Sequence, residues 1–324
     1  MSKPVRWGVL SGSNFAATTM APAIHEAEGA VLDAVATADP AKAARFQAFH
    51  PGIRVLPDYD GLLADPDIDA VYVPLPNSMH VDWTERALRA GKHVLTEKPI
   101  AVTAEEIDRL IALRDETGLL AAEAFMIVHH PQWQKARALL SEGAVGRLRH
   151  VDAAFSFFND DAGNIRNRAE VAGGSLRDIG VYTMGSVRFA TGEEPVSVEC
   201  SIDWEKGIDA TAHVAARFPS FTYRSMTSMR MCPRQEVIFH GTEALLRVPA
   251  PFNAAVFGEE QVILERADRS IERFRFPGTR QYKLQVEAFC RTVRDGAAYP
   301  WRLEDAKGTQ AMMDRAYAAA GPAG

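Results

Sequence analysis

The stretch VRWGVLSGSNFAA at residues 5–17 indicates the fold class of the first half of this chain. An apolar run at 5–10 enters a turn of small residues at 11–14, and a helix-like segment continues to about residue 28. This order is typical of the first crossover in a doubly wound sheet. Further strand-like runs alternate with helix-like stretches and lie at 30–37, 54–56, 69–76 and 93–99. The alternation predicts an α/β, Rossmann-type domain with a parallel sheet.

Two helix starts in this half carry recognisable capping residues. Asp39 precedes Pro40, which suits an N-cap followed by the first residue of a helix that continues to about residue 49. Thr103 is followed three residues later by Glu106, the pattern of a capping box, and predicts a helix over 103–118.

The chain changes character after about residue 123. A helix-like segment at 131–142 precedes a long strand-like run at 147–158, and another helix is expected over about 175–190. Period-2 runs then follow, which predict a mostly antiparallel sheet with one face covered; they lie at 196–204, 210–218, 221–230, 236–241 and 244–249. We therefore expect two domains, 1–122 and 123–324. The helical tail, 284–295 and 303–319, could pack back on the first.

Composition limits the possible functions. The 324 residues carry 36 Lys and Arg against 42 Asp and Glu, a formal net charge of −6, which does not favour nucleic acid or an anionic membrane. Cys200, Cys232 and Cys290 are far apart and predict free thiols in a reducing cytoplasm, and no export leader is recognised. His129-His130 has no further ligand at metal-binding spacing, so we expect no metal site.

The small-residue turn is a candidate phosphate-binding site. The dinucleotide fingerprint G-x-G-x-x-[GA] would fall on Ser11, Gly12, Ser13, Asn14, Phe15 and Ala16, with serine at both leading glycine positions. Backbone N–H groups at the start of the helix would hold a pyrophosphate there. A small-residue turn without a ligand is the open alternative.

The end of the second strand-like run bears on the choice of cofactor. NAD enzymes carry an acid there for the adenosine ribose, whereas this chain has Thr37 and Ala38. The next residue, Asp39, is already explained as a helix N-cap. With Lys42 and Arg45 following, NADP is favoured over NAD.

Two further motifs carry a family resemblance. VPLPNSMH at 73–80 and GKHVLTEKP at 91–99 are followed about 80 residues later by Asp178-x-x-x-Tyr182. With these, nearly the whole chain resembles the glucose–fructose oxidoreductase/inositol dehydrogenase/MocA (Gfo/Idh/MocA) family. It looks most like the branch of dimeric dihydrodiol dehydrogenases and NADP-dependent xylose dehydrogenases.

The resemblance implies roles for particular residues. Lys98 matches the active-site lysine, and Glu97 matches the residue beside the nicotinamide ribose. The matching family segment that lines the cofactor implies a similar role for Leu75, Pro76, Asn77 and His80. The family also implies that the second domain's open sheet joins chains into a homodimer or homotetramer.

The chemistry of the second motif can be argued from the residues. Asp178 and Tyr182 are four residues apart on an expected helix, so both project from one face. Hydride transfer at an alcohol carbon needs a group that moves the hydroxyl proton, and tyrosine serves near neutral pH only beside a cation that lowers its pKa. We assign Tyr182 as acid/base, Lys98 as that cation and Asp178 as the orienting group. Arg166 is a candidate substrate contact, with a solvated loop charge as the equal alternative.

These expectations converge on one function. The chain is predicted to be an NAD(P)-dependent dehydrogenase or reductase acting on a hydroxyl-bearing carbon of a sugar, cyclitol or vicinal diol. The alternative is a non-catalytic NAD(P)-binding sensor on the same fold, because fold alone does not fix function. A sensor would not need Lys98, Asp178 and Tyr182 together, and this favours the enzyme.

Overall fold

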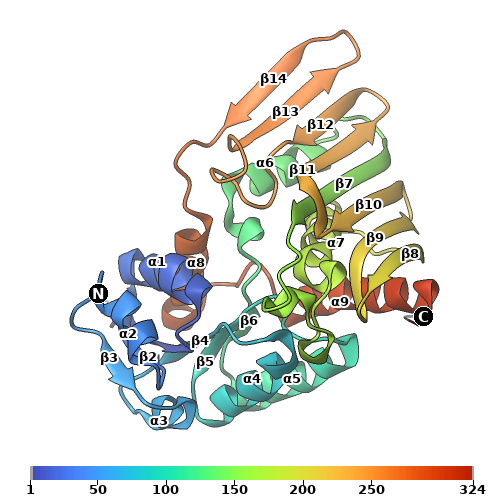
Figure 1. The fold of residues 1–324 in the computed structure, drawn as a ribbon. Coiled ribbons are helices and arrows are strands. Elements are labelled where there is room, and N and C mark those ends of the chain that lie inside the picture. The colour runs from blue at the N-terminus through green and yellow to red at the C-terminus, as the bar shows by residue number, and fades with distance from the viewer. Residues whose placement is uncertain (1–2, 323–324) are drawn as a thin grey trace. The chain divides into compact units, whose positions relative to one another are not determined.

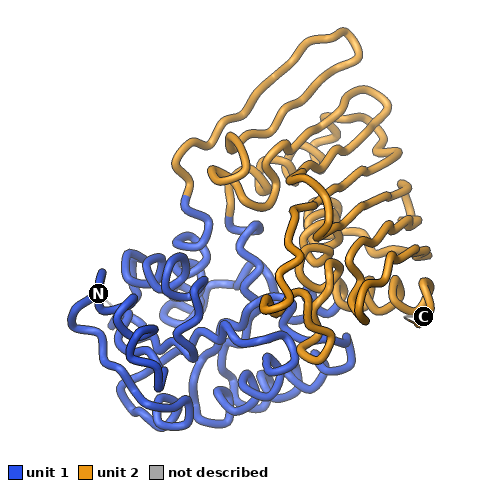
Figure 2. The backbone as a smooth tube through the Cα atoms, in the orientation of Figure 1, with its two compact units in different colours: residues 1–129, 280–307 blue, residues 130–279, 308–324 orange. Residues whose placement is uncertain are grey.

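The computed structural model describes residues 3–322 and divides the chain into two compact units. The first unit combines residues 1–129 with 280–307, and the second combines 130–279 with 308–324 (Figure 2). The segment 280–307 is thus distant in sequence from the rest of its unit. Each unit is built around one sheet (Figure 1).

The first unit contains a six-stranded parallel sheet in the order β3-β2-β1-β4-β5-β6. The order runs outward from β1 in both directions, as in dinucleotide-binding folds. The strands are β1 (Val5–Leu10), β2 (Ala30–Ala36), β3 (Arg54–Leu56), β4 (Ala70–Val73), β5 (His93–Thr96) and β6 (Ala121–Glu123). The predicted α/β class is confirmed, although the three-residue strand β6 was not anticipated.

Two helices of the first unit begin where the sequence places caps. The Asp39 carboxylate accepts hydrogen bonds from the Ala41 and Lys42 N–H groups, and Thr103 and Glu106 form the expected capping box. The helices are η1 (Ala16–Met20), α1 (Ala21–Glu26), α2 (Pro40–Gln47), α3 (Tyr59–Ala64), η2 (Asn77–Met79), α4 (His80–Arg89), α5 (Ala104–Thr117), η3 (Met126–His129) and α8 (Gln281–Asp295), and α9 (Leu303–Ala320) begins in this unit. The segment η1 is π-helical, and α3 was not anticipated.

The second unit contains an eight-stranded sheet in the order β14-β13-β12-β11-β7-β10-β9-β8. All neighbours are antiparallel except β7 and β10, which run parallel. The strands are β7 (Leu148–Phe158), β8 (Ser197–Glu205), β9 (Ile208–Arg217), β10 (Thr222–Ser228), β11 (Arg230–Gly241), β12 (Ala244–Val248), β13 (Gln261–Arg266) and β14 (Ile271–Arg275). The predicted mostly antiparallel sheet is confirmed. Sequence reasoning missed β13 and β14 and started β11 six residues late.

Helices cover one face of this sheet. They include α6 (Pro131–Ser141) and α7 (Val181–Thr191), which contact β7, β10, β12 and β13. Exposure alternates along the strands, so that Val214 and Tyr223 are buried whereas His213 and Arg224 are exposed. The last helix, α9 (Leu303–Ala320), starts in the first unit, where Leu303 belongs to the hydrophobic core.

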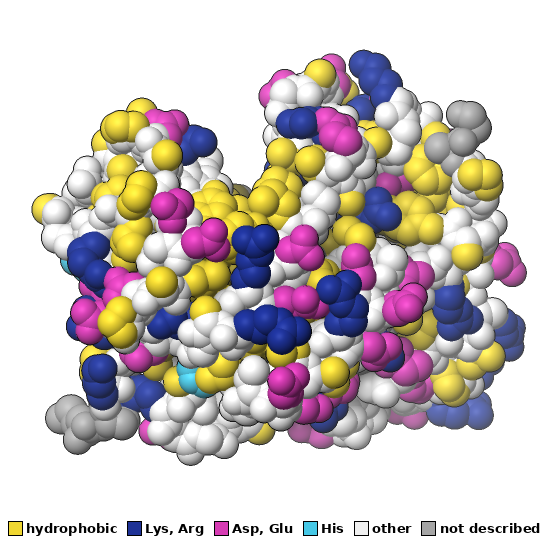
Figure 3. All heavy atoms as spheres, turned by 90° about the horizontal axis from the view of Figure 1, so that it is seen from below, with side chains coloured by type: hydrophobic (Ala, Val, Ile, Leu, Met, Phe, Trp, Pro, Cys, Tyr) yellow, Lys and Arg dark blue, Asp and Glu magenta, His cyan; other side chains and the backbone are white. Residues whose placement is uncertain are grey.

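Two surface properties bear on partners. Acidic and basic side chains are interspersed on the face drawn in Figure 3, without a large area of one sign. Within residues 3–322, no helix combines the length and apolar character needed to cross a bilayer.

The returning segment 280–307 supplies core to the first unit. The rings of Trp7 on β1 and Phe289 on α8 lie 4.7 Å apart between centroids, and both side chains are fully buried. We expect Phe289→Ala to lower the free energy of unfolding by about 3–5 kcal/mol because it leaves a cavity. The matched control is Phe158→Ala, whose side chain is 62% exposed and whose loss should cost under about 0.5 kcal/mol. Denaturant unfolding with equal costs for both variants would contradict this.

Candidate active site

The turn after β1 is shaped for close approach to its backbone. A Cβ atom at Gly12 would lie 2.6 Å from Lys42 Cβ and 3.3 Å from Thr37 Oγ1, so only glycine fits. Ser11 adopts a φ of +128°, a conformation that glycine prefers. Ser11, at the first glycine position of the fingerprint, therefore takes a glycine-like backbone conformation. This geometry fits a phosphate-binding cradle.

The other residues of the turn support the following helix. Ser13 Oγ accepts a hydrogen bond from the Ala16 N–H at 3.2 Å, and Asn14 Oδ1 accepts one from Arg45 Nη1 at 3.2 Å. The Phe15 ring, 39% exposed, lies edge-on to Tyr282 of α8 with centroids 5.6 Å apart. Arg45 is thus brought from α2 to the turn, which its sequence position did not reveal.

The end of β2 offers hydroxyl and cationic groups. Thr37 Oγ1 accepts a hydrogen bond from the Asp39 N–H at 3.2 Å, and Lys42 Nζ lies 4.0 Å from Asp39 Oδ2. Ala38, between them, contributes no polar side chain. The Asp39 carboxylate caps α2 and pairs with Lys42, and Arg45 adds a second cation that reaches the turn after β1.

The segment after β5 carries Glu97, Lys98 and Pro99. Tyr72 of β4 donates its hydroxyl hydrogen bond to Glu97 Oε1 at 2.6 Å, and the Lys98–Pro99 peptide bond is cis. Nearby, Leu75 and Pro76 lead into the 3-10 turn that begins at Asn77. The segments after β5 and β4 and the turn after β1 lie at the carboxyl ends of adjacent parallel strands in the order β1-β4-β5, the edge where ligands bind in such sheets.

His80 lies against the backbone of both of these segments. Its ring is 1% exposed, and its two nitrogens each lie 2.7 Å from a backbone carbonyl oxygen, those of Leu75 and Pro99. Burial lowers the pKa of His80, although the two carbonyl contacts oppose this. The side chain therefore links two backbone segments.

In the second unit, Asp178 and Tyr182 lie one turn apart. Asp178 belongs to the π-helical segment η6 (Leu176–Gly180), and Tyr182 lies in the first turn of α7, which continues it. Arg166 Nε donates a hydrogen bond to Asp178 Oδ2 at 2.6 Å. Sequence reasoning left Arg166 as either a substrate contact or a solvated loop charge, and it did not anticipate this ion pair.

Aromatic rings surround Tyr182, which is 8% exposed. The rings of Phe155 on β7 and Phe252 after β12 are stacked with centroids 5.0 Å apart. Each lies within 6 Å of the Tyr182 ring, at 5.8 and 5.6 Å. Phe252 comes from a loop that no motif marked, so its part in this cluster was not predictable.

A buried acid fixes the start of the helix that carries Asp178. Asp209 on β9 accepts hydrogen bonds from the Leu176 N–H at 2.6 Å, Ser175 Oγ at 3.1 Å and the Tyr317 hydroxyl at 2.8 Å. Burial raises the pKa of Asp209. Gly174 has a φ of +121°, and a Cβ there would lie 1.9 Å from Asp209 Oδ1. Glycine at this position therefore permits the carboxylate to reach the helix start.

The paired histidines, His129 and His130, are both buried. The pKa values of His129 and His130 are lowered by burial to about 3 and about 4. His130 Nδ1 accepts a hydrogen bond from the Gln132 N–H at the start of α6. Among residues 3–322, no group of three or more His, Cys, Asp or Glu side chains could hold a metal ion.

The first unit thus has the architecture of a dinucleotide-binding domain, and comparison with known proteins identifies the family. Residues 5–125 match the oxidoreductase family with an NAD-binding Rossmann fold, and residues 133–247 match the Gfo/Idh/MocA C-terminal domain. The chain belongs to the Gfo/Idh/MocA oxidoreductase family. It is an NAD(P)-dependent oxidoreductase.

Several relatives match along nearly the whole chain. A dTDP-3,4-didehydro-2,6-dideoxy-alpha-D-glucose 3-reductase from Saccharopolyspora spinosa is 36% identical over 91% of this chain and 90% of its own. A solved 3-ketoreductase from Actinomadura kijaniata, in complex with NADP and TDP-benzene, is 31% identical over 96% of both chains with a TM-score of 0.88.

The branch expected from sequence is more distant than these sugar reductases. A D-xylose 1-dehydrogenase (NADP(+)) from Haloferax volcanii is 29% identical over 97% of both chains. The family assignment is therefore confirmed, whereas the resemblance to the xylose and dihydrodiol dehydrogenase branch is the weaker one. The motifs shared across the family do not distinguish its branches, which explains the difference.

The strained serine of the nucleotide turn gives a stability prediction. We expect Ser11→Gly to raise the free energy of unfolding by about 1 kcal/mol, because glycine adopts the φ of +128° without strain. Ser13→Gly is the matched control; it removes the acceptor of the Ala16 N–H and should bring no gain. Chemical denaturation of the three proteins measures both effects. A loss of stability in Ser11→Gly would contradict the prediction.

Proposed function

We propose that this protein transfers hydride between NADP(H) and a ring carbon of a sugar, interconverting a keto group and a secondary alcohol. The observation that carries the proposal is the start of the η6–α7 helix, where Asp178, paired with Arg166, precedes Tyr182 by one turn. The proposal combines these groups with Lys98, which follows β5 of the dinucleotide-binding unit.

Each residue has a stated task in this proposal. When bound, the nicotinamide supplies or accepts the hydride. Tyr182 gives a proton to the carbonyl oxygen during reduction and takes it from the hydroxyl during oxidation, so proton and hydride together balance the reaction. Lys98 supplies the positive charge that favours the tyrosinate form. Asp178, held by Arg166, orients the substrate hydroxyl.

The relatives guide the substrate class. The 3-reductases act on a dTDP-linked keto-sugar by name, and the more distant xylose dehydrogenase acts on a free aldose. A nucleotide-linked keto-sugar is our leading substrate, with a free aldose, cyclitol or vicinal diol as the alternative.

Membership of an oxidoreductase family argues against the non-catalytic sensor that the sequence left open. Cys200, Cys232 and Cys290 are free thiols, which fits the cytoplasmic location that we propose.

Tyr182→Phe tests the enzymatic proposal. We expect kcat to fall by at least about 100-fold, because the ring remains and only the proton-transferring hydroxyl is lost. Nicotinamide absorbance should be followed with a dTDP-linked 3-keto-sugar, D-xylose, D-glucose, myo-inositol and a trans-dihydrodiol. Tyr223→Phe, in a buried tyrosine on β10, is the control and should keep its rate. An unchanged rate in Tyr182→Phe would remove this residue from the mechanism.

The cations near the nucleotide turn predict the cofactor preference. We expect NADPH to bind more tightly than NADH, and Arg45→Ala to weaken NADPH binding about tenfold because it removes a charged contact to the 2′-phosphate. Arg109→Ala, which removes a charge on α5 in the same unit, is the control. Fluorescence titration gives the dissociation constants. Equal affinity for both cofactors in the unaltered protein would overturn the preference.

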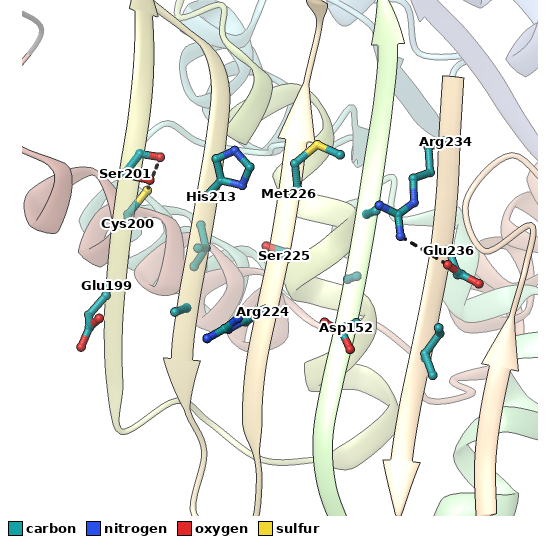
Figure 4. A pocket seen from close by; sticks show the side chains of 15 residues that line it. Asp152, Glu199, Cys200, Ser201, His213, Arg224, Ser225, Met226, Arg234 and Glu236 are labelled. Atoms are coloured by element: carbon teal, nitrogen blue, oxygen red, sulfur yellow. Dashed lines mark hydrogen bonds and ion pairs between the residues drawn. The ribbon is translucent and has the colours of Figure 1, made fainter. Parts of the chain in front are cut away.

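The open face of the second sheet is our candidate for self-association into a homodimer or homotetramer. Figure 4 shows side chains from five adjacent strands on this face, with acidic Asp152, Glu199 and Glu236 beside basic Arg224 and Arg234. A face that carries both charges can pair with its own copy about a twofold axis.

Light scattering tests this association. We expect a mass of two or four chains, and a shift toward the monomer in Met226→Lys, which places a charge in the middle of the face. Val256→Lys, at a position 88% exposed in a loop, should leave the mass unchanged. A monomer in the unaltered protein would refute the proposal.

A further inference from the structure

A single peptide group beside Lys98 is held at both of its ends by buried side chains. This is the Pro99–Ile100 peptide, which consists of the Pro99 carbonyl group and the Ile100 N–H group and comes one residue after Lys98. Its carbonyl oxygen lies 2.7 Å from His80 Nδ1, and its N–H donates a hydrogen bond to Glu123 Oε1 at 3.0 Å. His80 comes from the start of α4 and Glu123 from the end of β6, so two separate elements fix one peptide.

Glu123 is placed as a hydrogen-bond acceptor. It is 3% exposed, and its second oxygen accepts a hydrogen bond from Trp301 Nε1 at 2.9 Å. Burial raises the pKa of Glu123, whereas the hydrogen bonds from Ile100 and Trp301 and the charge of Lys98 oppose that rise. Burying a carboxyl group is unfavourable unless its oxygens are hydrogen-bonded. A residue needed only to fill space would be apolar here, so the acceptor function explains the acid.

His80 connects the same peptide to the turn after β4. Its Nε2 lies 2.7 Å from the Leu75 carbonyl oxygen, in the segment that leads to Asn77. Carbonyl oxygens only accept hydrogen bonds, so the contact with Pro99 requires a proton on His80 Nδ1, and the contact with Leu75 requires one on Nε2. The doubly protonated ring would donate to both carbonyl oxygens, whereas a neutral ring donates to one of them.

We propose that Glu123 and His80 are positioning residues, which clamp the Pro99–Ile100 peptide and thereby hold Lys98 in the place where it acts. The inference rests on the proposed function for the role of Lys98, whereas the clamp itself is a property of the first unit. A small displacement of a catalytic group lowers turnover strongly, by up to about 100-fold for 1 Å. Loss of the clamp should therefore lower turnover more than it weakens cofactor binding.

Nitrogen NMR of histidine-labelled, otherwise unaltered protein tests the clamp without any activity measurement. We expect His80 Nδ1 to carry a proton, alone or together with Nε2. His93 provides an internal reference in which Nδ1 carries no proton, because this nitrogen accepts a hydrogen bond from the Leu120 N–H at 2.8 Å. A His80 ring protonated only at Nε2 would overturn the clamp on the Pro99 carbonyl.

Kinetics of variants test the positioning role. Glu123→Ala should lower kcat by about 100-fold, with the dissociation constant for NADPH changed by less than about threefold. Glu123→Gln keeps one carbonyl oxygen for the Ile100 N–H and should restore most of the lost rate. His93→Ala, in a partly buried histidine of the same unit, is the control for general destabilisation and should keep kcat. Thermal unfolding sets an assay temperature at which every variant is folded.

The outcomes separate the two proposals. An active unaltered enzyme in which Glu123→Ala keeps its kcat would overturn the positioning role and leave the proposed function standing. A Glu123→Gln rate as low as that of Glu123→Ala would show that accepting the Ile100 hydrogen bond is insufficient, which also overturns it. An unaltered protein inactive on every substrate, with His80 Nδ1 protonated, would refute the proposed function and support the clamp.

Discussion

The meeting of parallel strand ends at one edge of the first sheet is the constraint on which the rest of the structure depends. β1, β4, β5 and β6 all run in the same direction, so the segments after them emerge side by side. These segments carry the Gly12 turn, Leu75, Lys98 and the loop after Glu123. Polar backbone and side-chain groups from distant parts of the sequence are thereby brought to one edge of the sheet.

Buried hydrogen-bonded acids hold both sets of candidate functional residues. Glu123 fixes the peptide after Lys98, and Asp209 fixes the helix start that precedes Asp178. Each carboxyl group accepts from backbone N–H and from an aromatic donor, Trp301 or Tyr317. Burial disfavours the charged form of each acid, and the hydrogen bonds offset that cost. Removing such donors would leave the acids unsatisfied, so these supports are less replaceable than surface ion pairs.

Two segments of the backbone depart from regular geometry. Ser11 takes a glycine-like conformation in the nucleotide turn, and the helix at Asp178 begins as a π-helical segment. Both irregularities lie at the candidate functional positions, where strained or unusual backbone is commonly retained. The regular strands and helices around them keep these positions fixed.

The sequence by itself determined the fold class, the helix caps at Asp39 and Thr103, and the candidate residues Lys98, Asp178 and Tyr182. These follow from local periodicity, capping chemistry and family motifs, which are written in neighbouring residues. Only the tertiary structure decided that Arg166 pairs with Asp178, that Phe252 packs against Tyr182 and that His80 and Glu123 hold the same peptide. It also decided the short strand β6 and the parallel pairing of β7 with β10. These contacts join residues from separate elements, and neither spacing nor composition encodes which distant partners the folded chain brings together.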